Sequence, residues 1–199
     1  IQPAAVKIGM LANGAIISRV AARLKHYQAR NIVVDPVMLA SSGQALLDPA
    51  ALETLVHELL PIAGLYTPNL DEGACLLGSK PASSKEEMLS VAMHLQTLGG
   101  CPVLLKGGHL SAEESPDLLL DGGGDTHWFT CRRINTNNLH GTGCTLSAAI
   151  AANLAQSNEG LHSTVAQAKN YLTTVLSNTD KLNVGSGPGP LHHLTGLWN

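Results

Sequence analysis

The stretch that decides the fold is Asn31–Pro36, NIVVDP, in which three unbroken β-branched residues end at an aspartate and a proline. β-branched residues favour extended backbone. A strand that is apolar at every position is typical of one buried on both faces, as the strands of parallel sheets are. We therefore predict a buried parallel strand over Ile32–Asp35.

Strands and helices alternate on both sides of this stretch, because apolar residues recur alternately in short runs and at helical spacing. A glycine-rich DGGGD between two apolar segments indicates a hairpin. The predicted strands are Val6–Met10, Ile32–Asp35, Leu65–Thr67 and Val103–Lys106, with hairpin strands Leu118–Leu120 and Thr126–Thr130. The predicted helices are Ala15–Gln28, a segment from Asp48 to Leu60, Leu70–Leu77, a segment from Ser84 to Leu98 with a Ser84/Glu87 capping box, Cys144–Gln156 and Leu161–Thr179.

This alternation predicts a single α/β domain over residues 1–199, a three-layer α/β/α sandwich. Its central sheet is expected to be mainly parallel, with the antiparallel hairpin at one edge. The handedness of βαβ crossovers is expected to place helices on both faces. Because the chain enters a strand almost at once from Ile1, we expect an N-terminal portion to be missing. The tail around His192 and His193 is expected to be solvated coil.

Composition narrows the class of protein. The chain is 44% hydrophobic and 14% charged, with a formal net charge of -3, which is typical of a globular domain. The lack of a basic run argues against a nucleic-acid partner, and the lack of an 18-residue apolar run argues against a membrane span. None of the four cysteines forms a C-x-x-C pair, so we expect free thiols in a reducing, cytoplasmic setting.

Polar side chains follow each predicted parallel strand. Asp35-Pro36 follows the first buried run, Thr67-Pro68-Asn69 and then Glu72 follow the next, and Lys106-Gly107 ends the third. Ligands bind at the carboxyl ends of strands in open parallel sheets. One edge of the sheet is therefore predicted to carry a metal–nucleotide site, with Asp35 and Glu72 near Mg²⁺ and Lys106 on nucleotide phosphates. The alternatives are a lysine that reaches solvent at the sheet edge and a glutamate that serves only the first turn of a helix.

The stretch Gly141–Cys144, GTGC, opens directly into an apolar helix. Glycines allow close approach of the backbone, and the free amides of a helix start attract anions. This pattern predicts an anion hole for a phosphoryl group in transfer, and a plain turn is the alternative. Cys144 is either a small buried residue or a thiol that the helix start favours in its ionised form, able to accept a proton.

These segments resemble the hydroxymethylpyrimidine/phosphomethylpyrimidine kinases of thiamine biosynthesis, within the ribokinase-like superfamily. The matching segments are KIGM (Lys7–Met10), VVDPVMLASSG (Val33–Gly43), TPNLDE (Thr67–Glu72), LLKGGH (Leu104–His109), SPDLL (Ser115–Leu119) and HGTGCTLSAAIAA (His140–Ala152). The resemblance implies ATP-dependent phosphorylation of a hydroxymethylpyrimidine and then of its monophosphate. It also implies a first N-terminal βα segment that this sequence lacks, and a possible homodimer.

The resemblance further implies roles for particular residues. Gly141, Thr142 and Gly143 would line the anion hole, and Cys144 would take the position of the catalytic base. Lys106, Asn69, Thr67 and Gly107 would contact ATP, Asp35 and Glu72 would organise Mg²⁺, and Gly9, Met10 and Val37 would border the pyrimidine.

Three other functions stay open from the sequence. A pyridoxal kinase would use the same scaffold, because pyridoxine-type rings also carry a hydroxymethyl group. A non-catalytic nucleotide-binding module would follow if the missing first segment left the substrate pocket incomplete. A hydrolase with Cys144 as nucleophile is the least favoured, since no partnered base is apparent.

Overall fold

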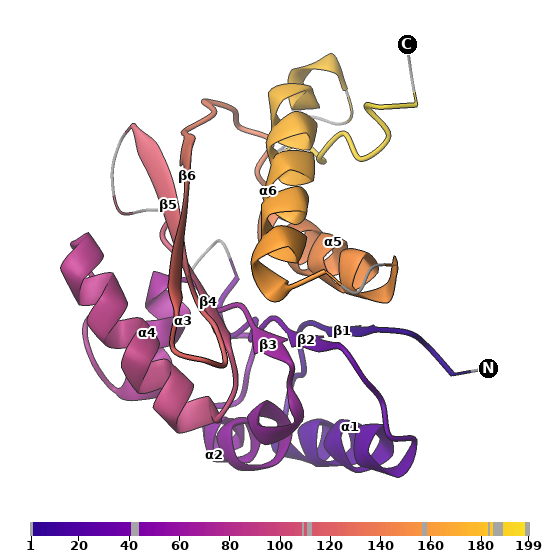
Figure 1. Cartoon of the computed structure of the whole chain (residues 1–199), viewed down its shortest axis with the longest axis vertical. Helices are drawn as coiled ribbons and strands as arrows, with labels where there is room; N and C mark the ends of the chain where they lie inside the picture. Colours follow the sequence, from indigo (N-terminus) through magenta and orange to yellow (C-terminus); the bar gives the residue numbers. More distant parts are fainter. Residues whose placement is uncertain are drawn as a thin grey trace.

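A computed structural model describes residues 2–40, 44–108, 110, 113–156, 159–182, 184 and 189–197. His109, residues 41–43 and residues 185–188 of the tail therefore lie outside the described residues. The described chain contains a six-stranded sheet in the order β1-β2-β3-β4-β5-β6. Strands β1 to β4 are parallel, whereas β5 runs antiparallel to both β4 and β6. Helices cover both faces of this sheet (Figure 1), so the predicted α/β/α sandwich is confirmed.

The strands are β1 (Val6–Ile8), β2 (Ile32–Val34), β3 (Leu65–Tyr66), β4 (Val103–Lys106), β5 (Glu114–Leu120) and β6 (Thr126–Arg132). The α-helices are α1 (Gly14–His26), α2 (Leu52–Thr54), α3 (Leu70–Leu77), α4 (Lys85–Gly99), α5 (Thr142–Gln156) and α6 (Leu161–Ser177). Shorter helical turns are η1 (Pro49–Ala51), η2 (Leu55–Leu59), η3 (Leu60–Ile62) and η4 (Thr179–Lys181).

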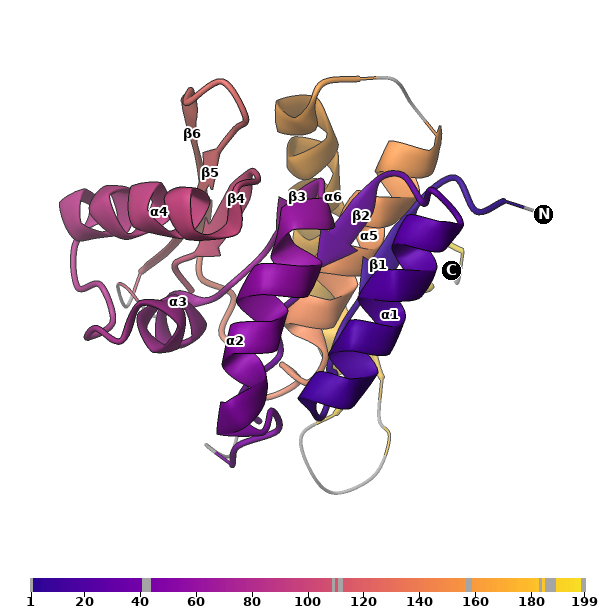
Figure 2. The same ribbon diagram turned by 90° about the horizontal axis from the view of Figure 1, so that it is seen from below.

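The two helical layers arise differently. The strands β1 to β4 lie side by side in chain order, so crossovers of one hand place α1 to α4 on the same face. The second face is covered by α5 and α6, which follow the hairpin β5–β6 (Figure 2). The expectation that crossover handedness alone would place helices on both faces was therefore wrong. Helices reach the second face because the chain returns across the sheet after the hairpin.

Two apolar cores separate the layers. The larger lies under α1, α2 and α4 and includes Ile17, Leu55 and Leu95. The smaller lies under α5 and α6, where Ile150 and Val165 pack on the other face of the strands. The sheet is thus buried on both sides, which explains the uninterrupted apolar run of β2, whose three residues are all buried.

Two helix caps differ from expectation. Ser84 caps α4 by accepting from the Glu87 amide, but the Glu87 carboxylate accepts from the Ser83 amide and hydroxyl, so the predicted reciprocal box is shifted by one residue. The complete capping box lies instead at α3, between Asn69 and Glu72. Asparagine caps as well as serine does, and the sequence pattern was present but overlooked.

Other boundaries also moved. The predicted helix from Asp48 to Leu60 changes its winding from η1 through α2 and η2 to η3, where Pro61 removes a helical donor. The hairpin strands are longer than predicted and begin at Glu114. His192 is buried, with 5% of its surface exposed, so its assignment to solvated coil was wrong.

Candidate active site

A row of polar side chains lies at the carboxyl edge of the parallel strands, on the face that α5 and α6 cover. Side chains alternate between faces along a strand. The residues that pack under α5 and α6 are Val33, Leu65, Leu104 and Leu119. The side chains two residues nearer the carboxyl edge, on the same strands or just beyond their ends, lie on the same face. They are Asp35, Thr67, Lys106 and Asp117. The sheet therefore brings together four polar groups from distant parts of the chain.

Asp35 is the centre of this row. It is 2% exposed, and its Oδ1 accepts from Lys106 Nζ at 2.9 Å and from Thr67 Oγ1 at 3.2 Å. The Lys106 side chain is 14% exposed, so it is not fully closed off from solvent. The prediction that the ends of β2, β3 and β4 bring polar groups together at one edge of the sheet is confirmed by these contacts.

The first turn of α5 lies directly over this pair. Gly141 has a φ of 86°, the left-handed conformation that glycine tolerates best. A Cβ on Gly143 would lie 3.3 Å from Lys106 Nζ and 3.8 Å from Asp35 Oδ2, so glycine permits the close approach. Within the described chain, the amides of Gly143 and Cys144 donate no hydrogen bond. A helix start with free amides beside an ammonium is suited to hold an anion.

Ser147 ties α5 to the sheet. It is fully buried, and its hydroxyl lies 3.2 Å from Asp35 Oδ2 and 3.0 Å from the Gly143 carbonyl. Sequence reasoning missed this residue. The available signal was a serine on the apolar stripe of the helix, because Ile150 and Ala151 follow it at helical spacing.

Glu72 joins α3 to the same edge. Its Oε2 accepts from the Asn69 amide at 2.8 Å, while Asn69 Oδ1 accepts from the Glu72 amide at 2.8 Å. Burial raises the pKa of Glu72 above its ordinary value, although Lys106 and the Asn69 hydrogen bond act in the opposite direction. Nearby Asp35 adds to the rise. Glu72 is therefore a first-turn helix acid that lies near enough to Asp35 and Lys106 for their charges to influence its pKa.

An ion pair that sequence reasoning missed lies beside Lys106. Lys169 of α6 donates to Asp117 Oδ2 at 2.6 Å, and the Gly107 amide donates to Asp117 Oδ1 at 3.0 Å. Burial works to lower the pKa of Lys169, but attraction and hydrogen bonding to Asp117 and Cys131 outweigh it, so the pKa is raised. The signals were an aspartate inside the apolar SPDLL and a lysine on the buried stripe of α6.

The remaining predicted anion-hole residues lie at the α5 start. Cys144 is exposed, so its reading as a buried residue was wrong. Thr142 Oγ1 donates to the Leu139 carbonyl at 2.6 Å and so shapes the turn. The free thiol of Cys144 is exposed in the first turn of α5.

The predicted pyrimidine-lining residues lie at the same edge. Gly9 and Met10 follow β1, whose Ile8 carbonyl accepts from the Asp35 amide at 2.9 Å. Val37 donates its amide to the Asp35 carbonyl at 2.8 Å. Met10 is 52% exposed, which is unusual for methionine and leaves its side chain available to a ligand.

Two residues that were predicted to contact ATP already make hydrogen bonds within the protein. The side chain of Thr67 is fully buried and its hydroxyl is bonded to Asp35. The Gly107 amide is bonded to Asp117, and a Cβ on Gly107 would lie 2.1 Å from the Pro116 carbonyl oxygen. In this structure both residues therefore hold neighbouring groups in place.

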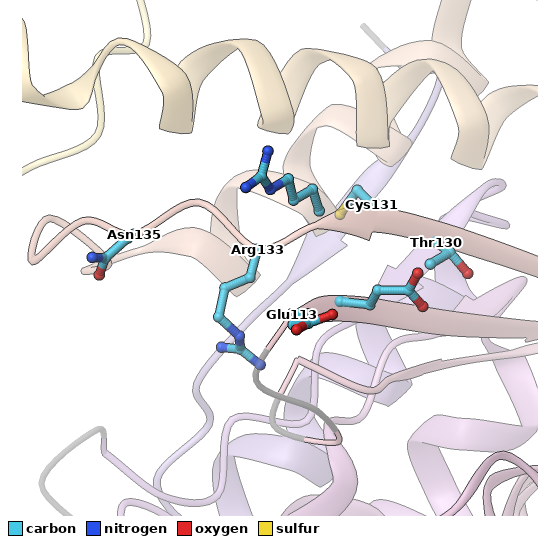
Figure 3. Close-up of a pocket in the computed structure, with 7 residues that line it drawn as sticks. Glu113, Thr130, Cys131, Arg133 and Asn135 are labelled. Atoms are coloured by element: carbon cyan, nitrogen blue, oxygen red, sulfur yellow. The ribbon is translucent and has the colours of Figure 1, made fainter.

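An open pocket of about 790 Å³ lies at the start of β5 and the end of β6 (Figure 3). The Arg133 amide donates to the Glu113 carbonyl at 2.9 Å, and the Arg133 guanidinium donates to the Gly108 carbonyl. The pocket contains none of the Asp35 row. Its lining residues are Glu113, Glu114, Thr130, Cys131, Arg132, Arg133 and Asn135.

Two kinds of feature are absent from the described residues. They contain no group of three or more histidine, cysteine, aspartate or glutamate side chains placed to hold a metal ion. None of their helices is long and apolar enough to cross a membrane.

Comparison with known proteins places this geometry in context. The profile of the family described as phosphomethylpyrimidine kinase matches residues 1–192. The hydroxymethylpyrimidine/phosphomethylpyrimidine kinase of Escherichia coli is 49% identical over 192 residues, which are 96% of this chain and 71% of that protein. An ADP complex of Bacillus subtilis pyridoxal kinase superposes with a TM-score of 0.87 at 31% identity, covering 98% of this chain and 72% of that one. Phosphomethylpyrimidine kinase from Clostridium difficile superposes with a TM-score of 0.72 at 37% identity, covering 87% of this chain and 69% of that one.

The fold and these relationships define a phosphotransferase with a ribokinase-like α/β architecture. Within that class, the chain belongs to the phosphomethylpyrimidine kinase family.

Proposed function

We propose that this chain transfers the γ-phosphoryl group of ATP to 4-amino-5-hydroxymethyl-2-methylpyrimidine, and then a second phosphoryl group to the resulting monophosphate, in thiamine biosynthesis. The observation that carries the proposal is the 49% identity to the hydroxymethylpyrimidine/phosphomethylpyrimidine kinase of Escherichia coli over 96% of the chain. The helix start of α5, whose free amides lie above Lys106 and Asp35, supports the proposal, because phosphoryl transfer needs positioning and charge stabilisation.

In the proposed reaction, the hydroxymethyl oxygen of the substrate forms a bond to the γ-phosphorus. The bond from that phosphorus to the β–γ bridging oxygen breaks, and ADP leaves with the electron pair. The amides of Gly143 and Cys144 and the ammonium of Lys106 offset the negative charge of the transferring group. Asp35 fixes the position of the Lys106 ammonium and, through Ser147, that of the α5 start, and Thr67 holds Asp35 itself.

The hydroxyl proton needs an acceptor, and Cys144 is an exposed ionisable group in the first turn of α5. We propose that its thiolate contributes but is secondary to alignment and charge. Cys144→Ala is then expected to lower kcat only a few-fold. A loss beyond about 10⁴-fold, the upper range for proton transfer by a side chain, would contradict this.

Asp35 and Glu72 are the residues that we propose to hold Mg²⁺. Both carboxylates already accept hydrogen bonds within the protein, so each has only part of its acceptor capacity left for an ion. Mg²⁺ takes only one or two carboxylates and keeps several of its waters, so these two residues fit it. When bound, Mg²⁺ neutralises charge on the nucleotide phosphates. Asp35→Asn is expected to raise the Mg²⁺ concentration needed for half-maximal activity, measured by titration at fixed ATP.

Product analysis by mass spectrometry tests the proposed function. The protein is incubated with Mg-ATP and, separately, the hydroxymethylpyrimidine, its monophosphate and pyridoxal. Phosphoryl transfer to the first two is expected. Transfer to pyridoxal alone would favour the second candidate, a pyridoxal kinase, to which the Bacillus subtilis superposition gives specific support. Nucleotide binding without transfer to any of them would favour a non-catalytic module.

We also propose a cellular location and an oligomeric state for the protein. All four cysteines are free thiols, which supports a reducing, cytoplasmic location. A homodimer is expected from the family resemblance, and sedimentation or light scattering at micromolar concentration distinguishes it from a monomer.

A further inference from the structure

Lys106 lies between two carboxylates. In the antiparallel pairing of β4 and β5, Lys106 is directly opposite Asp117. Side chains opposed in this way emerge on the same face, with Cβ atoms about 4.5–5.5 Å apart. On the other side Lys106 Nζ lies 2.9 Å from Asp35 Oδ1. The ammonium therefore has two possible partners, and among the described residues it is bound only to Asp35.

The charge of Asp117 is satisfied from a different helix. Lys169, on α6, places its Nζ 2.6 Å from Asp117 Oδ2, and the two side chains are 10% and 4% exposed. The other carboxylate oxygen accepts the Gly107 amide at 3.0 Å. Along this edge the charges therefore alternate: Asp35, Lys106, Asp117 and Lys169.

We propose that Lys169 is a positioning residue of the kinase: by neutralising Asp117, it leaves the ammonium of Lys106 free for Asp35 and for the nucleotide phosphates. This rests on the proposed function, in which Lys106 contacts those phosphates. Without Lys169, Asp117 would be a buried carboxylate lacking a counter-charge, which is strongly unfavourable. The nearest ammonium on the facing strand is Lys106, and Asp117 would draw it away from Asp35.

The backbone here leaves little room for another adjustment. Gly107 lies so close to β5 that a Cβ there would be 2.1 Å from the Pro116 carbonyl oxygen and 2.9 Å from Met88 Cε. The strands cannot move together further, and their register is held by four paired positions. Loss of the Lys169 charge is therefore relieved by side-chain movement, and Lys106 is the side chain within reach. The raised pKa of Lys169 is consistent with a lysine that stays charged.

The test breaks the same ion pair from each side. Lys169→Met leaves the Asp117 carboxyl without its ammonium partner, whereas Asp117→Asn removes the competing carboxylate and keeps an oxygen for the Gly107 amide. Both variants lose a buried ion pair, so both are expected to melt at a lower temperature. Binding of the ATP analogue AMP-PCP is measured by calorimetry below the melting transition, together with KM for ATP and KM for the pyrimidine. Lys181→Met, at an exposed lysine, is the matched control for one lost positive charge.

Lys169→Met is expected to weaken AMP-PCP binding about tenfold and to raise KM for ATP similarly, the effect of losing one charge-assisted hydrogen bond. KM for the pyrimidine should not change. Asp117→Asn should bind within about threefold of the wild type, and so should Lys169→Arg. The double variant Lys169→Met/Asp117→Asn should recover most of the affinity that Lys169→Met loses.

Equal losses of affinity in Lys169→Met and Asp117→Asn, or a double variant without recovery, would show a structural role only and overturn the inference. Lys106→Met separates this failure from failure of the proposed function. If Lys106→Met binds AMP-PCP as the wild type does, Lys106 does not contact the phosphates, and the inference falls together with the role proposed for Lys106; the product analysis decides the reaction itself separately. If Lys106→Met weakens binding and Lys169→Met does not, the inference alone is wrong. Should Lys169→Met not fold, Lys169→Gln takes its place with the same expectations.

Discussion

Gly143→Ala is expected to separate stability from catalysis. Gly143 lies in the first turn of α5, where replacing glycine by alanine favours the helix by up to about 1 kcal/mol. The added Cβ would lie 3.3 Å from Lys106 Nζ and 3.8 Å from Asp35 Oδ2. The ammonium ends a flexible side chain, so it can retreat by a few tenths of an ångström. We therefore expect the folded state to keep its stability or gain slightly.

Catalysis should suffer, because the methyl group occupies the space between the helix start and Lys106. That is where we place the transferring phosphoryl group. Losing one hydrogen bond to a charged group costs about 1.5–3 kcal/mol, which corresponds to a roughly 10- to 100-fold lower kcat/KM. The measurements are steady-state kinetics with the pyrimidine substrate and urea unfolding of the same preparation.

Gly160→Ala is the matched control. Gly160 also lies at a helix start, the N-cap of α6, but a Cβ there would meet no atom of the described residues within 4 Å. Its kinetics should equal those of the wild type. The reasoning would be refuted if Gly143→Ala kept kcat/KM within about threefold, since the phosphoryl group would then not lie between α5 and Lys106.

Three further outcomes are expected. Because the pKa of Glu72 in the folded state is raised above 4.5, the stability linked to this group is full at low pH and falls as pH rises through the raised value. Glu72→Gln keeps a cap acceptor and should therefore increase the free energy of unfolding more at pH 7 than at pH 4 in urea titrations; an equal change at both would contradict the shift. The Tyr66 hydroxyl is buried with no hydrogen-bond partner among the described residues, so Tyr66→Phe should stabilise the fold by about 1 kcal/mol, and a clear loss in thermal unfolding would reveal a partner. Iodoacetamide at pH 8 should modify the exposed Cys75 and Cys144 and spare Cys101, whose pKa burial raises to about 12; ATP should protect Cys144 but not Cys75, as peptide mass mapping would show.

The local pattern predicted most of the elements. The β-branched run at β2, the helical spacing in α1 and α6, and the glycines after α3 and α4 each reflect a preference that acts within a few residues. Strand ends and caps were less accurate, because they depend on pairing and on which acceptor a side chain reaches. The shift of the Glu87 hydrogen bond to Ser83 is an example.

The candidate site was predicted in part. Asp35 and Thr67 directly follow a buried strand and Lys106 ends one, so the rule that parallel strands end at one edge was enough to bring them together. Ser147, Asp117 and Lys169 were missed, because each looks like an ordinary polar residue until the element it lies on is packed. Their roles arise from contacts across 112, 10 and 52 residues of sequence separation.

The sequence by itself therefore determined the α/β class, the strand ends that carry chemistry and the glycine-rich helix start, since all of these follow from local preferences and chain order. Only the tertiary structure decided which partner each charge has. Lys106 is opposite Asp117 yet binds Asp35, because α6 brings Lys169 to Asp117 and α5 brings Gly143 over Lys106. Electrostatic energy depends on distances between side chains in the packed molecule, and spacing along the chain does not contain those distances.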